Sequence, residues 1–393
     1  MKKIYVYYLD NILGTVYIDN VRNKDIYSFE YSDYALMNNL RYILLDDEIL
    51  FTKGRQYKDK SNIPYHFLLD SMPDRWGRNL INRKYMGRII SDYQYLMSVS
   101  DISRMGALQY KYDIDGPYEL DDNDIPPYDY INTLCDAAYN YDELIEDDYW
   151  KILLSPGSSL GGSRPKASIY DNDHNLYLAK FNHKQDEYNV SKVEYLSYRL
   201  ATLVGINISP SRLIDIDNKK SVFLTRRFDR NKDKRIHYVS FMTLLNANEG
   251  ESGNYTYLDV VEKLSQFSGN INNDLLELFK RIAFYIIIHN YDDHLRNIGM
   301  VYIDKHWVLS PCFDVNITLY KGDLSLGIDG INDNTLETLI NNHSYFRLSI
   351  QAATKIVDDM KNVISNNIVS ISKEINIPKE VVDRIMFIMS NNL

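Results

Sequence analysis

The sequence is poor in the residues and patterns that mark several common protein classes. Its two cysteines, Cys135 and Cys312, stand far apart in a chain of 393 residues, so neither a disulfide framework nor a zinc site is indicated. The longest apolar run, Ile282 to Ile288, is far too short to span a bilayer. The N-terminal apolar run ends at Asp10, which argues against a signal peptide. These absences predict a soluble, cytoplasmic protein.

An excess of basic residues is also missing. The formal net charge of −10 argues against a sequence-independent nucleic-acid binder acting alone, although it suits a basic partner protein. Hydrophobic residues make up 45% and charged residues 25% of the chain, which is ordinary globular composition. A chain of this length can bury a large core and is expected to form two or three domains.

The most informative stretch runs from Asn290 to Asp314. Asn297 follows Asp292 by five residues, and a predicted hairpin, Ile298–Tyr302 and Trp307–Leu309, then leads to Asp314. Phosphoryl transfer from ATP needs these parts in this order: a carboxylate that orients the attacking hydroxyl, then an amide and a second carboxylate that hold magnesium. A polar loop that caps the buried helix predicted over 272–289 would explain the same spacing. Asp293 is a rival for the role of the first carboxylate.

A second constellation lies between Pro156 and Phe181. Three glycines and three serines fall within the seven residues 157–163, so backbone amides there could approach phosphate oxygens closely, although a flexible linker has the same composition. Predicted strands follow, and the second of them includes Lys180 in an apolar setting. The next predicted helix contains Glu194, which could orient Lys180 or simply lie exposed on the helix surface. This order is typical of the nucleotide lobe of a protein kinase.

The residues from Val222 to Arg230 complete this layout. A predicted strand runs into Arg226-Arg227-Phe228-Asp229-Arg230, at the point where the two lobes of a kinase join and backbone groups meet adenine. The basic cluster could equally be a solvated strand end. Strands are predicted over 3–9, 14–19, 26–31 and 324–328. A helical region is predicted over 67–86 with a break near residues 71–77, where Asp70 or Ser71 would be the N-cap. Amphipathic helices are predicted over 346–364 and 378–389. The fold class indicated is α+β, with a β-rich lobe, a helical lobe and a further N-terminal subdomain.

The chain resembles the HipA-like serine/threonine kinases, the toxin component of bacterial toxin–antitoxin pairs. The resemblance covers nearly the full length and rests on motifs in the expected order: Asp70-Ser71-Met72-Pro73-Asp74-Arg75-Trp76-Gly77, Arg104-Met105-Gly106-Ala107-Leu108, Gly157 to Lys166, Arg227-Phe228-Asp229-Arg230, Asp292 to Asn297, and Pro311-Cys312-Phe313-Asp314. It implies a HipA-type N-terminal subdomain over 1–120, a linker over 121–148, a kinase N-lobe over 149–230 and a helical C-lobe over 231–393.

The resemblance also implies roles for particular residues. Asp292 would be the catalytic base, and Asn297 and Asp314 would bind Mg²⁺. Ser159, or else Ser158, would be self-phosphorylated, and Glu194 would support Lys180. The residues expected to bind ATP are Gly161, Gly162, Ser163, Arg164, Lys166, Lys180, Thr225, Arg226, Arg227, Phe228, His294, Asn297 and Asp314.

Two departures from the family pattern concern basic residues. Arg296 stands where many relatives have lysine, which keeps a positive charge near the phosphates. Arg226 stands where the best-known member has an acidic residue, and this puts side-chain recognition of adenine in doubt.

The expected activity is ATP- and Mg²⁺-dependent phosphorylation of serine or threonine on a protein, and the resemblance implies an aminoacyl-tRNA synthetase as the substrate. The expected partner is a HipB-like helix-turn-helix antitoxin, with DNA reached through that partner. The alternatives are a catalytically weak corepressor and a small-molecule kinase.

Overall fold

The computed structural model describes residues 1–58, 63–118, 125–142, 152–153, 164–232, 234–320, 322–330 and 334–393. By its internal contacts the chain divides into two compact units. Unit 1 comprises Met1–Lys184 and Asp229–Val239, and unit 2 comprises Gln185–Phe228 and Ser240–Leu393. The chain therefore passes from unit 2 back into unit 1 for residues 229–239. These units are defined by contacts within the chain. The domain boundaries at residues 120, 148 and 230 remain predictions from the sequence.

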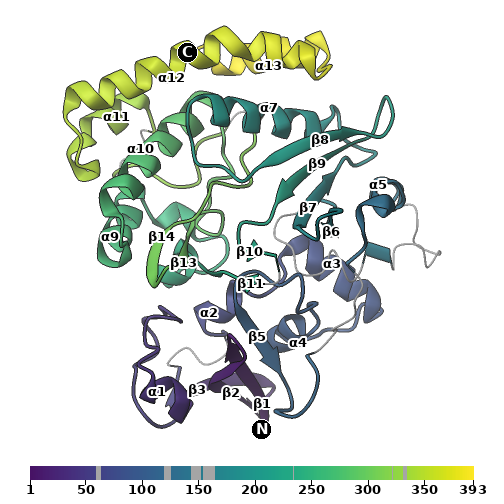
Figure 1. Ribbon diagram of the computed structural model, residues 1–393, viewed down its shortest axis with the longest axis vertical. Coiled ribbons are helices and arrows are strands. Elements are labelled where there is room, and N and C mark those ends of the chain that lie inside the picture. The colour runs from purple at the N-terminus through teal and green to yellow at the C-terminus, as the bar shows by residue number, and fades with distance from the viewer. Residues whose placement is uncertain are drawn as a thin grey trace. The chain divides into compact units, whose positions relative to one another are not determined.

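Unit 1 begins with an antiparallel meander (Figure 1). Its strands alternate buried apolar and exposed polar side chains, as a sheet with one covered face requires. Both hairpin turns use two residues with positive φ, Leu9-Asp10 and Arg22-Asn23, which matches the twist of the flanking strands. The five-stranded sheet is formed by β1 (Lys2–Tyr8), β2 (Asn11–Val21), β3 (Lys24–Tyr31), β4 (Gln56–Tyr57) and β5 (Leu108–Lys111) in the order β4-β3-β2-β1-β5.

The rest of unit 1 consists of short helices and hairpins. They are α1 (Asp33–Met37), α2 (His66–Leu69), α3 (Arg75–Lys84), α4 (Asp92–Met97), α5 (Ile131–Tyr139), β6 (Lys166–Tyr170), β7 (Leu176–Phe181), β10 (Arg230–Asn231), β11 (Lys234–Arg235) and β12 (His237–Ser240), which ends in unit 2. The break predicted within 67–86 is real, but α3 begins after Asp74 as N-cap rather than after Asp70 or Ser71. The segment predicted as a linker contains α5.

Three of the sequence motifs hold unit 1 together through Arg104. This side chain is buried, and its guanidinium donates hydrogen bonds to the carbonyl oxygens of Ser71 (2.9 Å), Leu96 (2.9 Å) and Val99 (3.1 Å). Arg230, in turn, donates to the carbonyl of Arg104 (2.6 Å), and the carboxylate of its neighbour Asp229 accepts the backbone N–H of Gly106 (2.8 Å). Buried polar groups that are hydrogen-bonded in this way favour one loop arrangement. These motifs therefore have a structural role.

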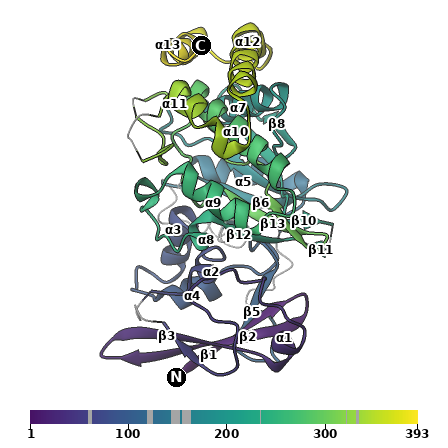
Figure 2. The same cartoon turned by 90° about the vertical axis from the view of Figure 1, so that its left-hand side faces the viewer.

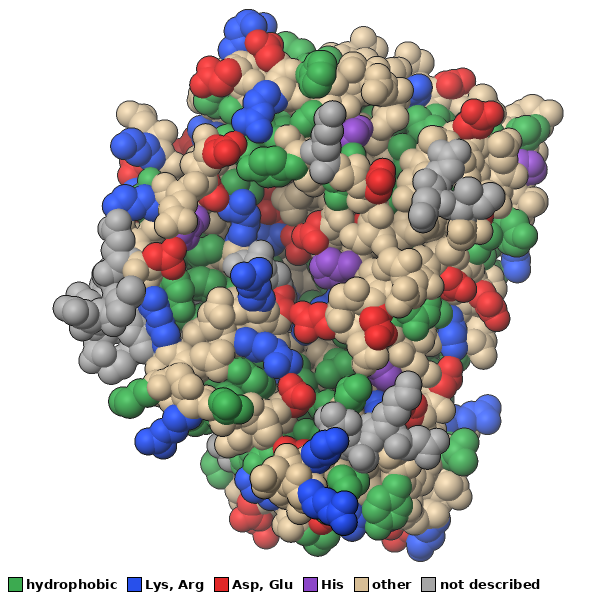
Figure 3. Space-filling model, turned by 180° about the vertical axis from the view of Figure 1, so that it is seen from behind, with side chains coloured by type: hydrophobic (Ala, Val, Ile, Leu, Met, Phe, Trp, Pro, Cys, Tyr) green, Lys and Arg blue, Asp and Glu red, His purple; other side chains and the backbone are tan. Residues whose placement is uncertain are grey.

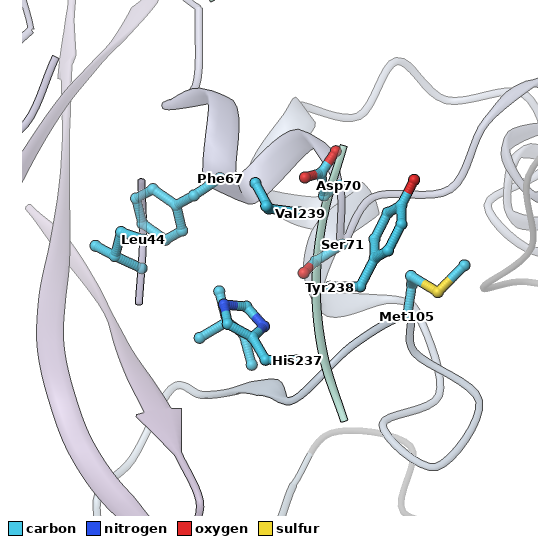
Figure 4. A pocket seen from close by; sticks show the side chains of 9 residues that line it. Leu44, Phe67, Asp70, Ser71, Met105, His237, Tyr238 and Val239 are labelled. Atoms are coloured by element: carbon cyan, nitrogen blue, oxygen red, sulfur yellow. The ribbon is translucent and has the colours of Figure 1, made fainter. Parts of the chain in front are cut away.

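A small pocket lies among the same motifs (Figure 4). It is lined by Leu44, Phe67, Asp70, Ser71, Met105, Leu108, His237, Tyr238 and Val239. The imidazole of His237 is buried and its Nε2 donates a hydrogen bond to the carbonyl oxygen of Ile43 (2.9 Å). Burial disfavours the charged imidazolium and lowers the pKa of His237 to about 4.

This histidine predicts a pH dependence of stability. The unfolded chain protonates His237 below its ordinary pKa of 6.5, whereas the folded chain does so only near 4, so stability is lost as pH falls through this window. From pH 7.5 to pH 5 we expect His237 to lower the free energy of unfolding by about 2 kcal/mol, a contribution that is absent in His237→Gln. Buried Asp46 and Asp293 have a pKa raised to about 6 and act in the opposite sense. The denaturant midpoints of the wild type and of His237→Gln, each measured at both pH values, give this loss. An equal change of midpoint with pH in the two proteins would contradict the assignment.

Unit 2 is mainly helical. Its elements are α7 (Val190–Leu203), β8 (Ser211–Asp215), β9 (Ser221–Arg226), α8 (Phe241–Leu244), α9 (Tyr257–Phe267), α10 (Ile271–Ile288), β13 (Gly299–Ile303), β14 (His306–Leu309), α11 (Leu336–Asn341), α12 (Ile350–Glu374) and α13 (Lys379–Met389). α10 is buried along most of its length, and α12 packs against both α7 and α10 (Figure 2). No helix among the described residues is long and apolar enough to cross a membrane. Acidic and basic side chains are intermixed on the face in Figure 3.

Candidate active site

The candidate loop follows the buried helix α10. Apolar residues on most sides of this helix place it in the core of unit 2, and it ends at His289, whose φ of 56° is left-handed. The N-cap is Asn270, two or three residues earlier than the sequence suggested. The chain then turns sharply, and the side-chain oxygen of buried Asn290 accepts the backbone N–H of Asn316 (3.0 Å). A rigid helix thus fixes the start of the loop.

Burial alternates along this loop. The Asp292 side chain is 56% exposed and that of His294 36%, whereas Asp293 and Leu295 are buried. His294 Nε2 lies 3.4 Å from Asp292 Oδ1. Asp292 is therefore accessible to solvent, and Asp293 is not. This arrangement favours Asp292 over its rival as the carboxylate that contacts a substrate.

The carboxylate of Asp293 is used inside the protein. Oδ2 accepts the hydroxyl of Tyr257 (2.6 Å), and Oδ1 accepts the backbone N–H of Ser325 (2.6 Å). Burial raises the pKa of Asp293 to about 6, while these hydrogen bonds oppose the shift. Sequence reasoning missed Tyr257 and Ser325, which lie 36 and 32 positions away.

Asn297 and Asp314 flank the predicted hairpin. β13 and β14 pair with Met300 opposite Leu309, and the Ser310 N–H donates to the Gly299 carbonyl (2.9 Å), so both flanking segments leave from the same end. The Asn297 amide N–H donates to the backbone oxygen of Asp292 (2.9 Å), which links these two residues. Asp314 has a left-handed φ of 55°, and its Oδ1 accepts from Asn316 Nδ2 (3.2 Å).

The segment that contains Asp314 is anchored on both sides. Buried Arg281 of α10 donates to the Ser310 carbonyl (2.8 Å), and the Tyr285 hydroxyl lies 3.0 Å from Cys312 Sγ. The ring of Phe313 packs against that of Phe228, with centroids 5.2 Å apart. The chain on the N-terminal side of Asp314 is therefore held by packed neighbours. Phe228, which was expected near adenine, packs against Phe313, the residue before Asp314.

In unit 1, the structure brings two lysines together. Lys166 and Lys180 are directly opposite one another on β6 and β7, so their side chains share a face, and both are buried. Two buried ammonium groups at such spacing need anionic partners, such as carboxylates or phosphates. The indole N–H of Trp76 donates to the Lys166 carbonyl (3.1 Å), which shows how the motif containing Trp76 supports β6. No register was assigned to this hairpin from the sequence, so the pairing of Lys166 with Lys180 is a finding of the structure.

The other predicted residues lie on several elements. Glu194 is buried on α7 rather than exposed, and its pairing with Lys180 stays a prediction. Thr225 pairs with Ser211 in the β8–β9 hairpin, and the Arg226 N–H donates to the Pro210 carbonyl (2.9 Å). Arg227 is buried. The backbone N–H of Arg226 is therefore hydrogen-bonded within the β8–β9 hairpin region.

Several predicted residues fall outside the described ranges. They are Ser158, Ser159, Gly161, Gly162 and Ser163. Arg164, at the start of the next described range, is exposed.

One further group of metal-type ligands occurs among the described residues. Asp46, Glu48 and His66 of unit 1 have ligand atoms within 4.8 Å of one another. The buried ammonium group of Lys58 forms an ion pair with Glu48, and Asp46 accepts the backbone N–H groups of Glu48 and Phe67. Since a lysine already supplies the positive charge, we interpret this group as an internal ion network.

Solved structures include one that is similar over almost the whole chain. HipA of Shewanella oneidensis MR-1, solved with HipB and its operator DNA, gives a TM-score of 0.70 at 15% identity, covering 99% of this chain and 96% of that chain. The mixed α and β elements and this match confirm the predicted fold class.

Curated relatives match over shorter stretches. A Sinorhizobium fredii protein named "Putative kinase Y4mE" is 27% identical over 136 residues, 32% of each chain. A Haemophilus influenzae protein named "Putative kinase" is 23% identical over 186 residues, 42% of this chain and 54% of that protein. The chain thus spans between about a third and about half the length of these relatives.

The family comparison covers more of the sequence. The model of the HipA-like C-terminal domain matches residues 158–368, more than half of the chain, and includes β6, β7, the loop after α10 and Asp314. The chain therefore belongs to the family of proteins with a HipA-like C-terminal domain.

Proposed function

We propose that the chain is an ATP- and Mg²⁺-dependent serine/threonine protein kinase of the HipA toxin type. The observation that supports this most is the arrangement in unit 2. The exposed Asp292 accepts a hydrogen bond at its backbone oxygen from the Asn297 side chain. Asn297 precedes β13 and Asp314 follows β14, so both lie at the same end of the β13–β14 hairpin. The kinase names of the curated relatives agree with it.

The side chains fit the proposed metal. A carboxylate and an amide oxygen are hard oxygen ligands of the kind that Mg²⁺ takes together with phosphate oxygens and water. Because Asn297 uses its amide nitrogen in the bond to Asp292, that bond leaves its carbonyl oxygen to serve as a ligand. When bound, Mg²⁺ would neutralise charge on the phosphates.

The residues of the chain would divide the remaining work. Asp292 would accept a hydrogen bond from the acceptor hydroxyl and orient it toward the phosphorus. Lys166 and Lys180, with the glycine-rich loop that includes Gly161, Gly162, Ser163 and Arg164, would bind phosphate oxygens. Glu194 would support Lys180. Thr225, Arg226, Arg227, Phe228 and His294 would contact the nucleotide.

The substrate and partners are proposals by analogy. An aminoacyl-tRNA synthetase is the first substrate to test, and self-phosphorylation of Ser159 would switch the kinase off. A HipB-like antitoxin is the proposed partner, since the similar Shewanella protein was solved with HipB and operator DNA. A phosphoproteomic comparison of cells that express the chain or its Asp292→Asn variant would identify the substrate, and identical phosphoproteomes would contradict a protein substrate.

Removal of the metal tests the reaction class. We expect the purified chain to consume γ-³²P-labelled ATP in Mg²⁺ and to stop when EDTA is added in excess, because the phosphate charge is then not neutralised. Restoring Mg²⁺ should restore turnover, which serves as the control. A chain that consumes no ATP in Mg²⁺, or consumes it equally in EDTA, is not the proposed kinase.

A further inference from the structure

Asp293 has an environment unlike that of its neighbour Asp292. It is 1% exposed, and its two carboxylate oxygens are bound by groups from separate parts of unit 2: the hydroxyl of Tyr257 on α9 and the backbone N–H of Ser325. One side chain therefore connects the candidate loop to a helix before it and to a segment after Asp314.

The segment after Asp314 returns to the candidate loop at several points. Asn316 bonds to Asn290, the Thr318 N–H donates to the His289 carbonyl (3.0 Å), and the Ser325 hydroxyl donates to the Tyr291 carbonyl (2.7 Å). The bond from the Ser325 N–H to Asp293 completes this series. Among these contacts, Asp293 is the one that also reaches α9.

The direction of Asp292 depends on that of Asp293. Burial alternates from residue 292 to 295, so an inward Asp293 goes with an outward Asp292. A purely apolar filler could occupy the space beneath the loop without the cost of burying a carboxylate. Only an acceptor with two oxygens can hold the Tyr257 hydroxyl and the backbone at Ser325 at once, and this sets the loop in one orientation.

We propose that Asp293 is a positioning residue for the phosphoryl transfer, and that its contacts with Tyr257 and Ser325 hold the Asp292 carboxylate in its productive direction. This inference rests on the proposed function. It concerns the placement of the base, and Asp293 itself does not contact the substrate. A misplacement of about 1 Å can lower a rate about 100-fold.

The test compares Asp293→Asn, Asp293→Ala, Tyr257→Phe and the double variant Asp293→Asn/Tyr257→Phe with the wild type. For each, thermal unfolding reports the fold, calorimetry with Mg²⁺ and a non-hydrolysable ATP analogue gives the number of nucleotides bound per chain, and phosphate release from ATP gives turnover per bound nucleotide. Asp304→Asn, the same change at an exposed turn of the hairpin, and Tyr345→Phe at an exposed tyrosine are matched controls.

We expect binding close to one nucleotide per chain and little change in affinity. Turnover per bound nucleotide should fall about 10-fold in Tyr257→Phe and Asp293→Asn and about 100-fold in Asp293→Ala. The double variant should lose little beyond the worse single one, because both changes break one connection. Should Asp293→Ala fail to fold, Tyr257→Phe removes a single hydrogen bond and decides the question.

Two results would overturn the proposal. One is turnover per bound nucleotide that stays within about twofold of wild type in both Tyr257→Phe and Asp293→Asn. A fall in total activity that only matches the fraction of folded chains counts as this result. The other is an active Asp292→Asn together with an inactive Asp293→Asn, which would make Asp293 the base. A wild type that consumes no ATP would instead refute the proposed function.

Discussion

Asp292→Asn should lower ATP turnover by about 10³-fold or more while the protein stays folded. An asparagine fills the same volume, but it cannot accept a proton or orient the acceptor hydroxyl as a carboxylate does, and a positioned base contributes about 10²- to 10⁴-fold. Because this side chain is 56% exposed, its replacement should cost little stability. Label transfer from γ-³²P-labelled ATP and thermal unfolding measure the two effects.

Asp304→Asn is the matched control for this experiment. It makes the same chemical change in the turn between β13 and β14, where Asp304 is exposed and has a left-handed φ of 50° that asparagine tolerates. This variant should keep the wild-type rate. If Asp292→Asn were as active as Asp304→Asn, Asp292 would not be the base.

Arg104→Ala should destabilise the protein by about 4 kcal/mol. The change removes the donor to three buried carbonyl oxygens, of Ser71, Leu96 and Val99, and leaves a cavity against the ring of Tyr110. Unsatisfied buried carbonyls cost about 1–3 kcal/mol each when they cannot find water. Denaturant unfolding measures the loss, and hydrogen exchange of peptides over residues 96–110 locates it in unit 1.

Two further variants make the experiment specific. Arg104→Lys keeps the charge, but an ammonium cannot replace the planar guanidinium fork, so about half of the loss should remain. Arg88→Ala removes an exposed arginine and should change stability by less than about 0.5 kcal/mol. Equal stability of Arg104→Ala and Arg88→Ala would show that the motif around Arg104 has no structural role.

The sequence revealed the elements whose signals are local. Three strands were predicted near the N-terminus, where the structure has β1, β2 and β3, and the apolar stretch before Asn290 predicted α10. The hairpin from β13 to β14 was also visible, because a short polar turn separates two apolar runs. The order of candidate residues around it followed from the chain alone.

Other features depend on partners that are distant in the sequence. The different environments of Asp292 and Asp293 arise from Tyr257, on a helix that was not anticipated. Residues 324–328 were expected to form a strand, but they make a single bridge, between Gly327 and Thr256. The backbone N–H of Ser325 instead donates to the side chain of Asp293. Phe346 was expected in the long helix α12. It instead packs on Phe279 in a short 3₁₀ turn, and α12 starts after its cap, Ser349.

The central claim is that Asn297 and Asp314 share one metal ion on the nucleotide phosphates. A crystal structure of the chain with Mg²⁺ and a non-hydrolysable ATP analogue tests it most directly. We expect a single ion bound by the Asn297 side-chain oxygen, the Asp314 carboxylate and phosphate oxygens, with the Asp292 carboxylate facing the terminal phosphate. Side chains of Asn297 and Asp314 that point away from one another, with no ion between them, would contradict it.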